Sequence, residues 1–267
     1  SFGLTYPGCD LRCAQSVEEV IQYETPETVA AVLVESVVGS NGLIVPPEGY
    51  MQRLREICTR NGVLLIADEV MSGFGRTGKW FAIDNWNVVP DMIVMAKGLT
   101  SGYVPLGGIA LSKKITDVLD KQMLYAGLTY NAHPLACATA IATLEVYRED
   151  KLMENAVAMG EVIRQEFEAM KAKHRSVGEA RGIGLFWAIE LVKDKKTRQP
   201  LVKWNAMGAE AAVSRELNKR LLAGGVYTTV RWNFLFVAPP LCIKEGELRE
   251  GLKIIDKVLD YADTIAS

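Results

Sequence analysis

The chain alternates between short, continuous apolar runs and longer stretches in which apolar positions recur with a helical period. The continuous runs predict buried strands at 30–35, 63–67, 92–96 and 109–112. Between the first two, residues 48–60 have the pattern of an amphipathic helix, which predicts a strand, helix, strand unit with parallel strands. Continuous apolar strands of this kind are typical of a sheet covered on both faces.

The second half of the chain begins with helical periodicity and then mixes both kinds of element. Residues 133–173 predict two consecutive long helices. Beyond them the pattern predicts strands at 185–192 and 234–237 and helices at 206–223 and 245–262, with a glycine pair after residue 223 as a helix stop. This part of the chain therefore predicts a small α+β domain.

The predicted fold class is α/β, with two domains. Residues 1–150 form a large domain with a mainly parallel sheet that ends in a linker helix, and residues 151–267 form the small α+β domain. A chain of 267 residues, of which 49% are hydrophobic, is long enough to bury a core in each.

Charge and composition narrow the classes of partner. The chain has 30 basic and 32 acidic residues and a net charge of -2, which leaves no field to attract nucleic acid. No run approaches the roughly 18 apolar residues of a membrane span. The five cysteines are scattered without a companion histidine cluster, so no metal site is predicted and a reducing cytoplasm is expected. Small polar molecules are the expected partners.

Two charged residues stand at the ends of two apolar strands. Lys97 follows the run 92–96 and Asp68 follows the run 63–67, so both lie at strand carboxyl ends, where open α/β sheets bind ligands. Singly, each has an ordinary explanation, because a lysine is normally a solvated charge and an acid after a strand often caps a helix. Together they indicate chemistry, because desolvated charge is costly unless it is paired or used. An amine and a carboxylate at one sheet edge suit pyridoxal phosphate.

Four stretches of the chain carry a resemblance to a known family. They are Leu65-Ile-Ala-Asp-Glu-Val70 running into Gly73-Phe-Gly-Arg-Thr-Gly78, then Asp91-Met-Ile-Val-Met-Ala-Lys-Gly98, Pro105-Leu-Gly-Gly108 and Gly127-Leu-Thr-Tyr-Asn-Ala-His-Pro134. In this order and spacing, the chain resembles the class III aminotransferases, the omega-aminotransferase group of fold type I enzymes. The resemblance covers nearly the whole chain, and it implies the cofactor pyridoxal 5'-phosphate.

The resemblance also implies a role for individual residues. Lys97 would hold the cofactor's aldehyde as a Schiff base and then move a proton to and from the substrate. Asp68 would bond the protonated ring nitrogen, which favours the electron-withdrawing cationic form. Val70, two residues on and therefore on the same strand face, would pack against the ring, and Glu35 would lie beside Asp68. Glu69 would point away, and no catalytic role is assigned to it.

Thr129 resembles a family threonine that holds the cofactor phosphate of the neighbouring subunit. That resemblance implies a homodimer, or a dimer of dimers, with a shared active site. The alternative is a local one, because Thr129 also precedes a helix expected to begin near His133 and Pro134, where a threonine can act as a cap.

Departures from the family pattern bear on the substrate. The ornithine and 4-aminobutyrate branch pairs a glutamate with an arginine, but Ser40 and Phe236 stand at these positions here. The glutamate and the arginine are both absent, as expected if one is, because a buried arginine without its glutamate would be costly. Arg231 lies close to where the omega-amine and pyruvate branch has an arginine, and its planar fork suits a carboxylate or a sulfonate. Exposure at a loop tip is the alternative for Arg231.

The remaining basic side chains and histidines are expected to be structural. Arg76 is expected to hold its glycine-rich turn, and Arg181, which precedes Gly182-Ile-Gly184, is expected to have a structural role. His174 is expected to be exposed, because its neighbours along the chain are lysines and an arginine. Neither this histidine nor His133 is needed as a base or as a metal ligand.

The resulting hypothesis is transamination from an omega-amino acid or amine, such as beta-alanine or taurine, to a keto acid, with pyruvate favoured. An ornithine- or 4-aminobutyrate-type aminotransferase, an aminomutase and an inert or nucleotide-binding α/β module remain alternatives, although no G-x-G-x-x-G follows a strand. Full-length relatives have a long segment before the matching region. That preceding segment contains a phosphate-binding loop and a ring-stacking aromatic residue. The chain is therefore expected to be a truncated C-terminal portion with an incomplete pocket, inactive by itself.

Overall fold

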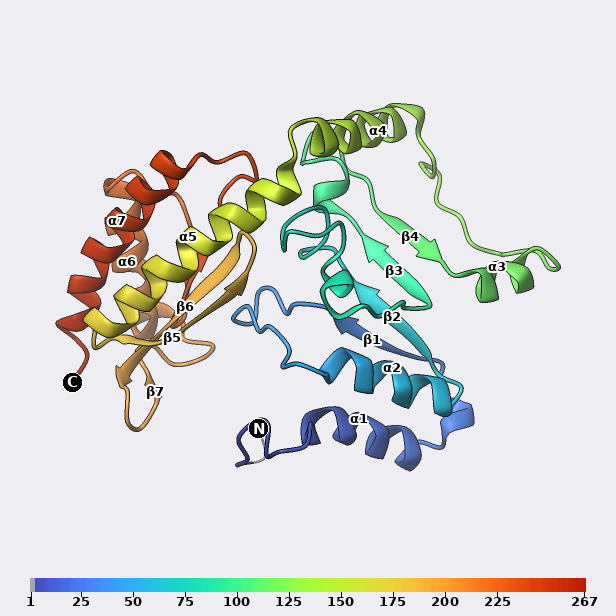
Figure 1. Cartoon of the computed structure of the whole chain (residues 1–267), viewed down its shortest axis with the longest axis horizontal. Helices are drawn as coiled ribbons and strands as arrows, with labels where there is room; N and C mark the ends of the chain where they lie inside the picture. The colour runs from blue at the N-terminus through green and yellow to red at the C-terminus, as the bar shows by residue number, and fades with distance from the viewer. Residues whose placement is uncertain (1–2) are drawn as a thin grey trace. The chain divides into compact units, whose positions relative to one another are not determined.

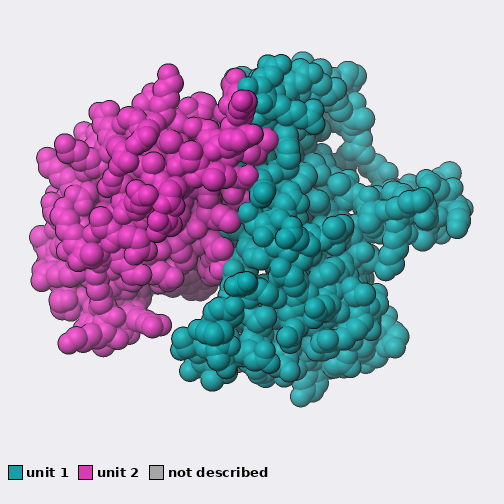
Figure 2. Space-filling view, in the orientation of Figure 1, with its two compact units in different colours: residues 1–37, 46–75, 79–149 teal, residues 38–45, 76–78, 150–267 magenta. Residues whose placement is uncertain are grey.

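The structure is a computed structural model that describes residues 3–267. The chain divides into two compact units, coloured separately in Figure 2. Unit 1 consists of Ser1–Val37, Pro46–Gly75 and Lys79–Glu149, and unit 2 consists of Val38–Val45, Arg76–Gly78 and Asp150–Ser267. The two short segments of unit 2 that interrupt unit 1 have no signal in the hydrophobic pattern.

Unit 1 is built on a four-stranded sheet in the order β1-β2-β3-β4 (Figure 1). Strands Ala31–Glu35 (β1), Leu64–Asp68 (β2) and Met92–Met95 (β3) are parallel, and Gly108–Leu111 (β4) is antiparallel to β3. The connection from β3 to β4 contains only the short 3-10 helix Lys97–Leu99 (η3). A connection without a crossover helix returns the chain in the antiparallel direction, so the sheet is mainly but not wholly parallel.

Helices cover one face of this sheet. Unit 1 contains Arg12–Tyr23 (α1), Tyr50–Arg60 (α2), Lys113–Leu119 (α3) and Pro134–Glu149 (α4), and the 3-10 helices Pro26–Thr28 (η1) and Ala82–Trp86 (η2). Ile21 of α1 and Ile57 of α2 are buried in a common core with Val63, against which Val32 of β1 packs. Burial of these aliphatic side chains is what holds α1 and α2 to the strands, at roughly 1.5–3 kcal/mol for each fully buried side chain.

The opposite face of the sheet carries exposed apolar side chains. Leu33 of β1 is 62% exposed and Ile109 of β4 is 63% exposed. Glu35 lies two residues after Leu33, so it shares this face with its register partner Asp68, which pairs through β3 with Ile109. The sequence predicts cover on both faces, but within residues 3–267 the face that carries Glu35 and Asp68 is open.

Unit 2 is an α+β unit, as the sequence predicts. Its antiparallel sheet has the order β5-β6-β9-β8, with β7 paired to β6. The strands are Val177–Ile183 (β5), Phe186–Asp194 (β6), Gln199–Pro200 (β7), Val230–Arg231 (β8) and Phe234–Val237 (β9). Helix Leu152–Lys173 (α5) packs on β5, and Ala212–Ala223 (α6), which follows the 3-10 helix Gly208–Ala211 (η4), packs with Glu245–Asp263 (α7). Across residues 3–267, every helix is too short or too polar to span a bilayer.

Two arginines hold loops of unit 2 in place, as expected from the sequence. The guanidinium of Arg76 donates hydrogen bonds to the carbonyls of Leu185 at 3.1 Å and Pro239 at 2.6 Å. Arg181 donates to the carbonyl of Gly42 at 2.9 Å and forms an ion pair with Glu190 at 2.6 Å. Because Arg76 and Gly42 belong to the short interrupting segments, these contacts fasten both segments to the rest of unit 2.

His174 is buried, and the expectation that it is exposed is wrong. Its side chain is 1% exposed, because it follows α5 and turns toward α7. Its Nδ1 lies 2.7 Å from Oδ2 of Asp263 and its Nε2 lies 3.0 Å from Oδ1 of Asp256. The basic neighbours along the chain gave no sign of these acidic partners, which lie more than eighty positions away. The contacts join the end of α5 to α7.

Asp263 is expected to make unit 2 sensitive to acid. Burial raises the pKa of Asp263, but hydrogen bonds from the hydroxyl and backbone N–H of Ser176 and from His174 outweigh burial and lower the pKa below its usual value. A carboxyl whose pKa is lowered by folding stabilises the fold above its unfolded pKa, about 3.9, and this contribution is lost as the pH falls through the folded pKa. Asp263→Asn should therefore cost roughly 1–3 kcal/mol near neutral pH and much less in acid.

Urea unfolding at pH 7 and near pH 3 measures this difference. The exposed Asp260, on the same face of α7, supplies the matched control Asp260→Asn, for which little change is expected at either pH. An equal loss for Asp263→Asn at both pH values would show that the charge of Asp263 has no part in stability.

Candidate active site

Three of the predicted site residues lie at the carboxyl ends of adjacent parallel strands. Glu35 is the last residue of β1 and Asp68 the last residue of β2, and the two are register partners. On its other side Asp68 pairs with Val94 of β3, and Lys97 follows Val94 by three residues. The parallel order of β1, β2 and β3 therefore brings a carboxylate pair and an amine to one edge of the sheet.

The backbone of Lys97 adopts an unusual conformation. Its φ angle is 44°, in the left-handed region that residues other than glycine rarely occupy. A hydrogen bond from α4 holds this turn in place: the hydroxyl of Tyr147 donates to the carbonyl of Gly98 at 2.9 Å. A side chain at Gly98 would come within 2.8 Å of Cβ of Phe74. Strained backbone that the surroundings enforce is a recurrent feature of functional sites.

The side chain of Lys97 is exposed at an open depression of about 660 Å³. The depression is formed by the turn after β3 and the glycine-rich segment that leads to β4, with the lining residues Ala96, Lys97, Thr100, Gly102, Val104, Pro105, Leu106 and Gly107. Within residues 3–267 the amine of Lys97 has no hydrogen bond or ion pair. It is therefore available for a ligand.

Asp68 is oriented by its own backbone turn. Its Oδ1 accepts a 3.0 Å hydrogen bond from the backbone N–H of Val70, and its Oδ2 has no hydrogen-bond partner within residues 3–267. Strand β2 ends at Asp68, and Val70 lies in the following turn. The strand alternation that predicted a common face for the two residues therefore does not extend to Val70. Its contact with a cofactor ring stays a prediction.

Thr129 lies in an exposed segment, 121–135, that precedes and enters α4. Its side chain makes no hydrogen bond in the part of the chain that the structure describes, and α4 begins five residues later at Pro134. The alternative of a helix cap therefore finds no support. The role in binding phosphate stays a prediction.

Arg231 lies in unit 2 at the tip of the hairpin formed by β8 and β9. It is exposed, and its guanidinium carbon lies 4.2 Å from the centre of the Trp232 ring. Trp232 in turn contacts Trp204, with ring centres 5.2 Å apart. Apart from this stacking, the guanidinium has no hydrogen bond or ion pair to any of residues 3–267. A stacked, unpaired arginine can accept an anionic group.

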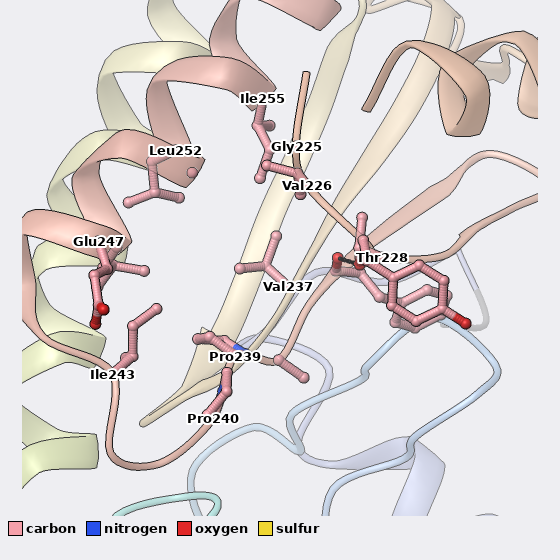
Figure 3. Close-up of a pocket in the computed structure, with 15 residues that line it drawn as sticks. Gly225, Val226, Thr228, Val237, Pro239, Pro240, Ile243, Glu247, Leu252 and Ile255 are labelled. Atoms are coloured by element: carbon pink, nitrogen blue, oxygen red, sulfur yellow. Dashed lines mark hydrogen bonds between the residues drawn. The ribbon is translucent and has the colours of Figure 1, made fainter. Parts of the chain in front are cut away.

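A second cavity, of about 310 Å³, lies wholly within unit 2 between the end of β9, the segment 225–228 and the first turns of α7 (Figure 3). Val226, Val237 and Leu252 give it an apolar lining. Its one carboxylate, Glu247, already accepts the backbone N–H of Lys244 at 3.1 Å. No lysine is among its described lining residues, so it lacks an amine for covalent chemistry.

Two residues near the site were missed by reasoning from the sequence. Tyr147 holds the Lys97 turn through Gly98, and Glu69 is fully buried directly after Asp68. The only sequence signal for Glu69 is its position beside Asp68, because alternation along a strand places its side chain on the opposite face. For Tyr147 no signal exists, since its partner lies 49 positions away.

Comparisons with known proteins show the family to which the chain belongs. The family model for class III aminotransferases matches residues 7–259. The putrescine–pyruvate aminotransferase of Pseudomonas aeruginosa is 37% identical over 92% of this chain and 53% of its own length. The taurine–pyruvate aminotransferase of Bilophila wadsworthia is 34% identical over 94% of this chain and 59% of its own length. The chain belongs to the class III aminotransferase family.

A solved structure supports the same assignment. The taurine:2-oxoglutarate aminotransferase of Bifidobacterium kashiwanohense, determined with pyridoxal phosphate and glutamate, is 42% identical and superposes with a TM-score of 0.93 over 99% of this chain. The predicted α/β, fold type I architecture is thereby confirmed. The chain covers 60% of that structure, and 53% and 59% of the two relatives above, so it spans little more than half of the proteins it matches.

Proposed function

We propose that this chain carries the catalytic lysine and the ring-binding carboxylate of a pyridoxal-phosphate-dependent aminotransferase. The amino donor is an omega-amino acid or an amine, such as beta-alanine or taurine, and the acceptor is a keto acid, with pyruvate favoured. One observation carries the proposal: Asp68 ends β2, Lys97 lies two residues after the end of the neighbouring parallel strand β3, and both have unpaired polar atoms within residues 3–267.

The residues present fit pyridoxal phosphate. The unpaired amine of Lys97 would attach to the aldehyde, and Oδ2 of Asp68 would accept a hydrogen bond from the protonated ring nitrogen. Glu35, the register partner of Asp68, would add a second negative charge beside that carboxylate. When bound, pyridoxal phosphate supplies the electron sink that the reaction needs. Lys97 would then carry a proton on Nζ to and from the substrate carbon, and its exposed position at the depression leaves it mobile enough to do so.

The choice of substrate is inferred from unit 2. Ser40 and Phe236 occupy the positions at which a glutamate and an arginine pair in the ornithine and 4-aminobutyrate branch. The absence of this glutamate–arginine pair supports an amino donor outside that branch. Arg231, stacked on Trp232 and unpaired, would bind the carboxylate or sulfonate of a substrate. Two of the relatives named above are pyruvate enzymes and one is a 2-oxoglutarate enzyme, so 2-oxoglutarate is the competing acceptor.

The proposed assembly is a homodimer or a dimer of dimers with a shared active site. Thr129 supports it, because its exposed hydroxyl has no partner within residues 3–267 and would reach the phosphate of a second copy. The neighbouring Tyr125, Leu128 and Tyr130 are 78% to 91% exposed, which is typical of an interface. The five cysteines are free thiols, which supports a reducing compartment, the cytoplasm.

Borohydride reduction in the presence of pyridoxal phosphate tests the proposal. Peptide mass spectrometry is expected to find the cofactor adduct on Lys97. An unreduced portion of the preparation, assayed with beta-alanine, taurine and an uncharged amine, should require an added keto acid and should prefer the anionic donors. An adduct distributed over several exposed lysines would contradict the assignment of Lys97, and turnover without a keto acid would favour a mutase.

A further inference from the structure

Glu69 is a fully buried carboxylate to which the proposed reaction gives no task. It is 0% exposed, and it has no ion pair with any of residues 3–267. Burying an ionisable group without a cation is costly unless hydrogen bonds compensate. The hydrogen bonds that compensate for this burial also fix the position of the backbone nearby. Glu69 lies directly between Asp68 and Val70, so the backbone that it fixes is that of the proposed site.

Four donors surround the carboxylate of Glu69. Its Oε1 accepts hydrogen bonds from the hydroxyl of Ser36 at 2.6 Å and the backbone N–H of Ile83 at 2.8 Å. Its Oε2 accepts from the hydroxyl of Ser72 at 2.7 Å and the backbone N–H of Ala82 at 2.9 Å. All four partners donate to it, which is the pattern of an acceptor-only carboxylate. Each oxygen is satisfied twice.

The backbone of Glu69 is fixed as firmly as its side chain. Its N–H donates to the carbonyl of Val94 at 2.9 Å, and its carbonyl accepts the N–H of Gly73 at 3.0 Å. Val94 is the register partner of Asp68 in β3, so this bond continues the sheet one residue past the end of β2. The next peptide provides the N–H of Val70, which donates to Oδ1 of Asp68. The backbone of Glu69 is therefore fixed on both sides, and the peptide that follows it donates the hydrogen bond that orients Asp68.

The partners of Glu69 come from three separate parts of unit 1. Ser36 follows the last residue of β1, Ser72 belongs to the turn after β2, and Ala82 and Ile83 begin η2. One carboxylate thus connects the residues that follow β1 and β2 to the start of η2. Movement of Glu69 would release the backbone on which the orientation of Asp68 depends.

We propose that Glu69 is the positioning residue of this site. Through its bonds to Ser36, Ser72 and the start of η2, it holds the segment 68–70, so that Asp68 presents Oδ2 to the ring nitrogen. The inference rests on the proposed function for the identity of the ring, but the hold on the segment is a property of the chain alone. Glu69 touches neither cofactor nor substrate in this role, and it acts through Asp68.

Glu69→Gln is the sharpest test, because it keeps the shape and removes one acceptor. Whichever way the amide turns, its NH2 group faces one backbone N–H, that of Ala82 or of Ile83, and cannot accept it. Amide hydrogen exchange of the cofactor-free protein should become about tenfold faster, or more, in the segment 68–73, because charge-assisted hydrogen bonds are lost. Exchange in α5 should be unchanged.

The second measurement reports on Asp68 itself. With pyridoxal phosphate labelled at the ring nitrogen, nitrogen NMR is expected to show a protonated nitrogen in the wild type and a shift toward the unprotonated form in Glu69→Gln. Asp91→Asn is the matched control, because Asp91 is another carboxylate of unit 1 with little exposure, bonded to Arg55 and to the N–H of Leu65, but it lies at the amino end of β3. It should lower stability and leave the ring nitrogen protonated.

The outcomes separate the two proposals. A wild type that binds no pyridoxal phosphate at Lys97 would contradict the proposed function, and hydrogen exchange would still decide whether Glu69 holds segment 68–70. Faster exchange with an unchanged ring nitrogen would overturn the positioning role and leave a structural one. If Glu69→Gln does not fold, Ser36→Ala and Ser72→Ala each remove one donor without changing the charge, and the same pair of measurements applies to them.

Discussion

Under the proposed function, Lys97→Ala is expected to abolish covalent attachment of pyridoxal phosphate and to remove nearly all transaminase activity of the complete enzyme. The loss of the proton carrier alone should lower kcat by roughly 10²- to 10⁴-fold. Because the amine of Lys97 has no partner within residues 3–267, its removal should leave the fold unchanged. The visible absorbance of the lysine-bound cofactor, recorded with the single-turnover rate, measures both effects.

Lys113→Ala is the matched control for this variant. Lys113 is an exposed lysine of α3 in the same unit, and its ion pair with Asp117 is a surface pair of little energetic weight. The control should keep the absorbance and the rate. A Lys97→Ala protein that still forms a borohydride-reducible adduct at one defined lysine would show that another residue carries the cofactor.

Asp68→Asn is expected to have the second largest effect. The amide has no negative charge with which to hold a proton on the ring nitrogen, so the electron-withdrawing form of the cofactor becomes less populated. We expect kcat to fall by roughly 10²- to 10³-fold, comparable with the loss of one strong electrostatic contact in an active site. Lys97 would still attach the cofactor, so the adduct should remain after borohydride reduction.

The comparison that isolates this effect uses Asp120→Asn, the same change at an exposed carboxylate that follows α3. Steady-state rates and the amount of bound cofactor, measured together, separate loss of chemistry from loss of binding. An Asp68→Asn protein with the kcat of the wild type would remove Asp68 from the mechanism, and one that fails to bind cofactor would give it a binding role instead.

The strands of unit 1 could be predicted because each is a continuous apolar run. Strand β5 could not, because Val177–Ile183 contains two glycines and two charged residues, and it forms through its pairing with β6. Helix α1 was missed for another reason. Its N-cap residue, Leu11, provides no side-chain hydrogen bond, so the sequence lacks the usual signal of a helix start.

The candidate site divides in the same way. Asp68 and Lys97 could be found from the sequence, because their position depends only on where two strands end. The direction of β4 and the open face of the sheet depend on which segments meet in space, and the hydrophobic pattern contains no information on either. The burial of His174 likewise depends on acids of α7 that are remote in the sequence.

By itself, the sequence indicated the strands of unit 1, each to within about a residue at its ends, and the residues that resemble an aminotransferase site, because these follow from local periodicity and from motif order. Only the tertiary structure decided that the Glu69 carboxylate accepts four hydrogen bonds, since its partners lie 33 positions before it and 3, 13 and 14 positions after it. A buried carboxylate is stable only where several donors converge on it, and that convergence is a property of the folded chain.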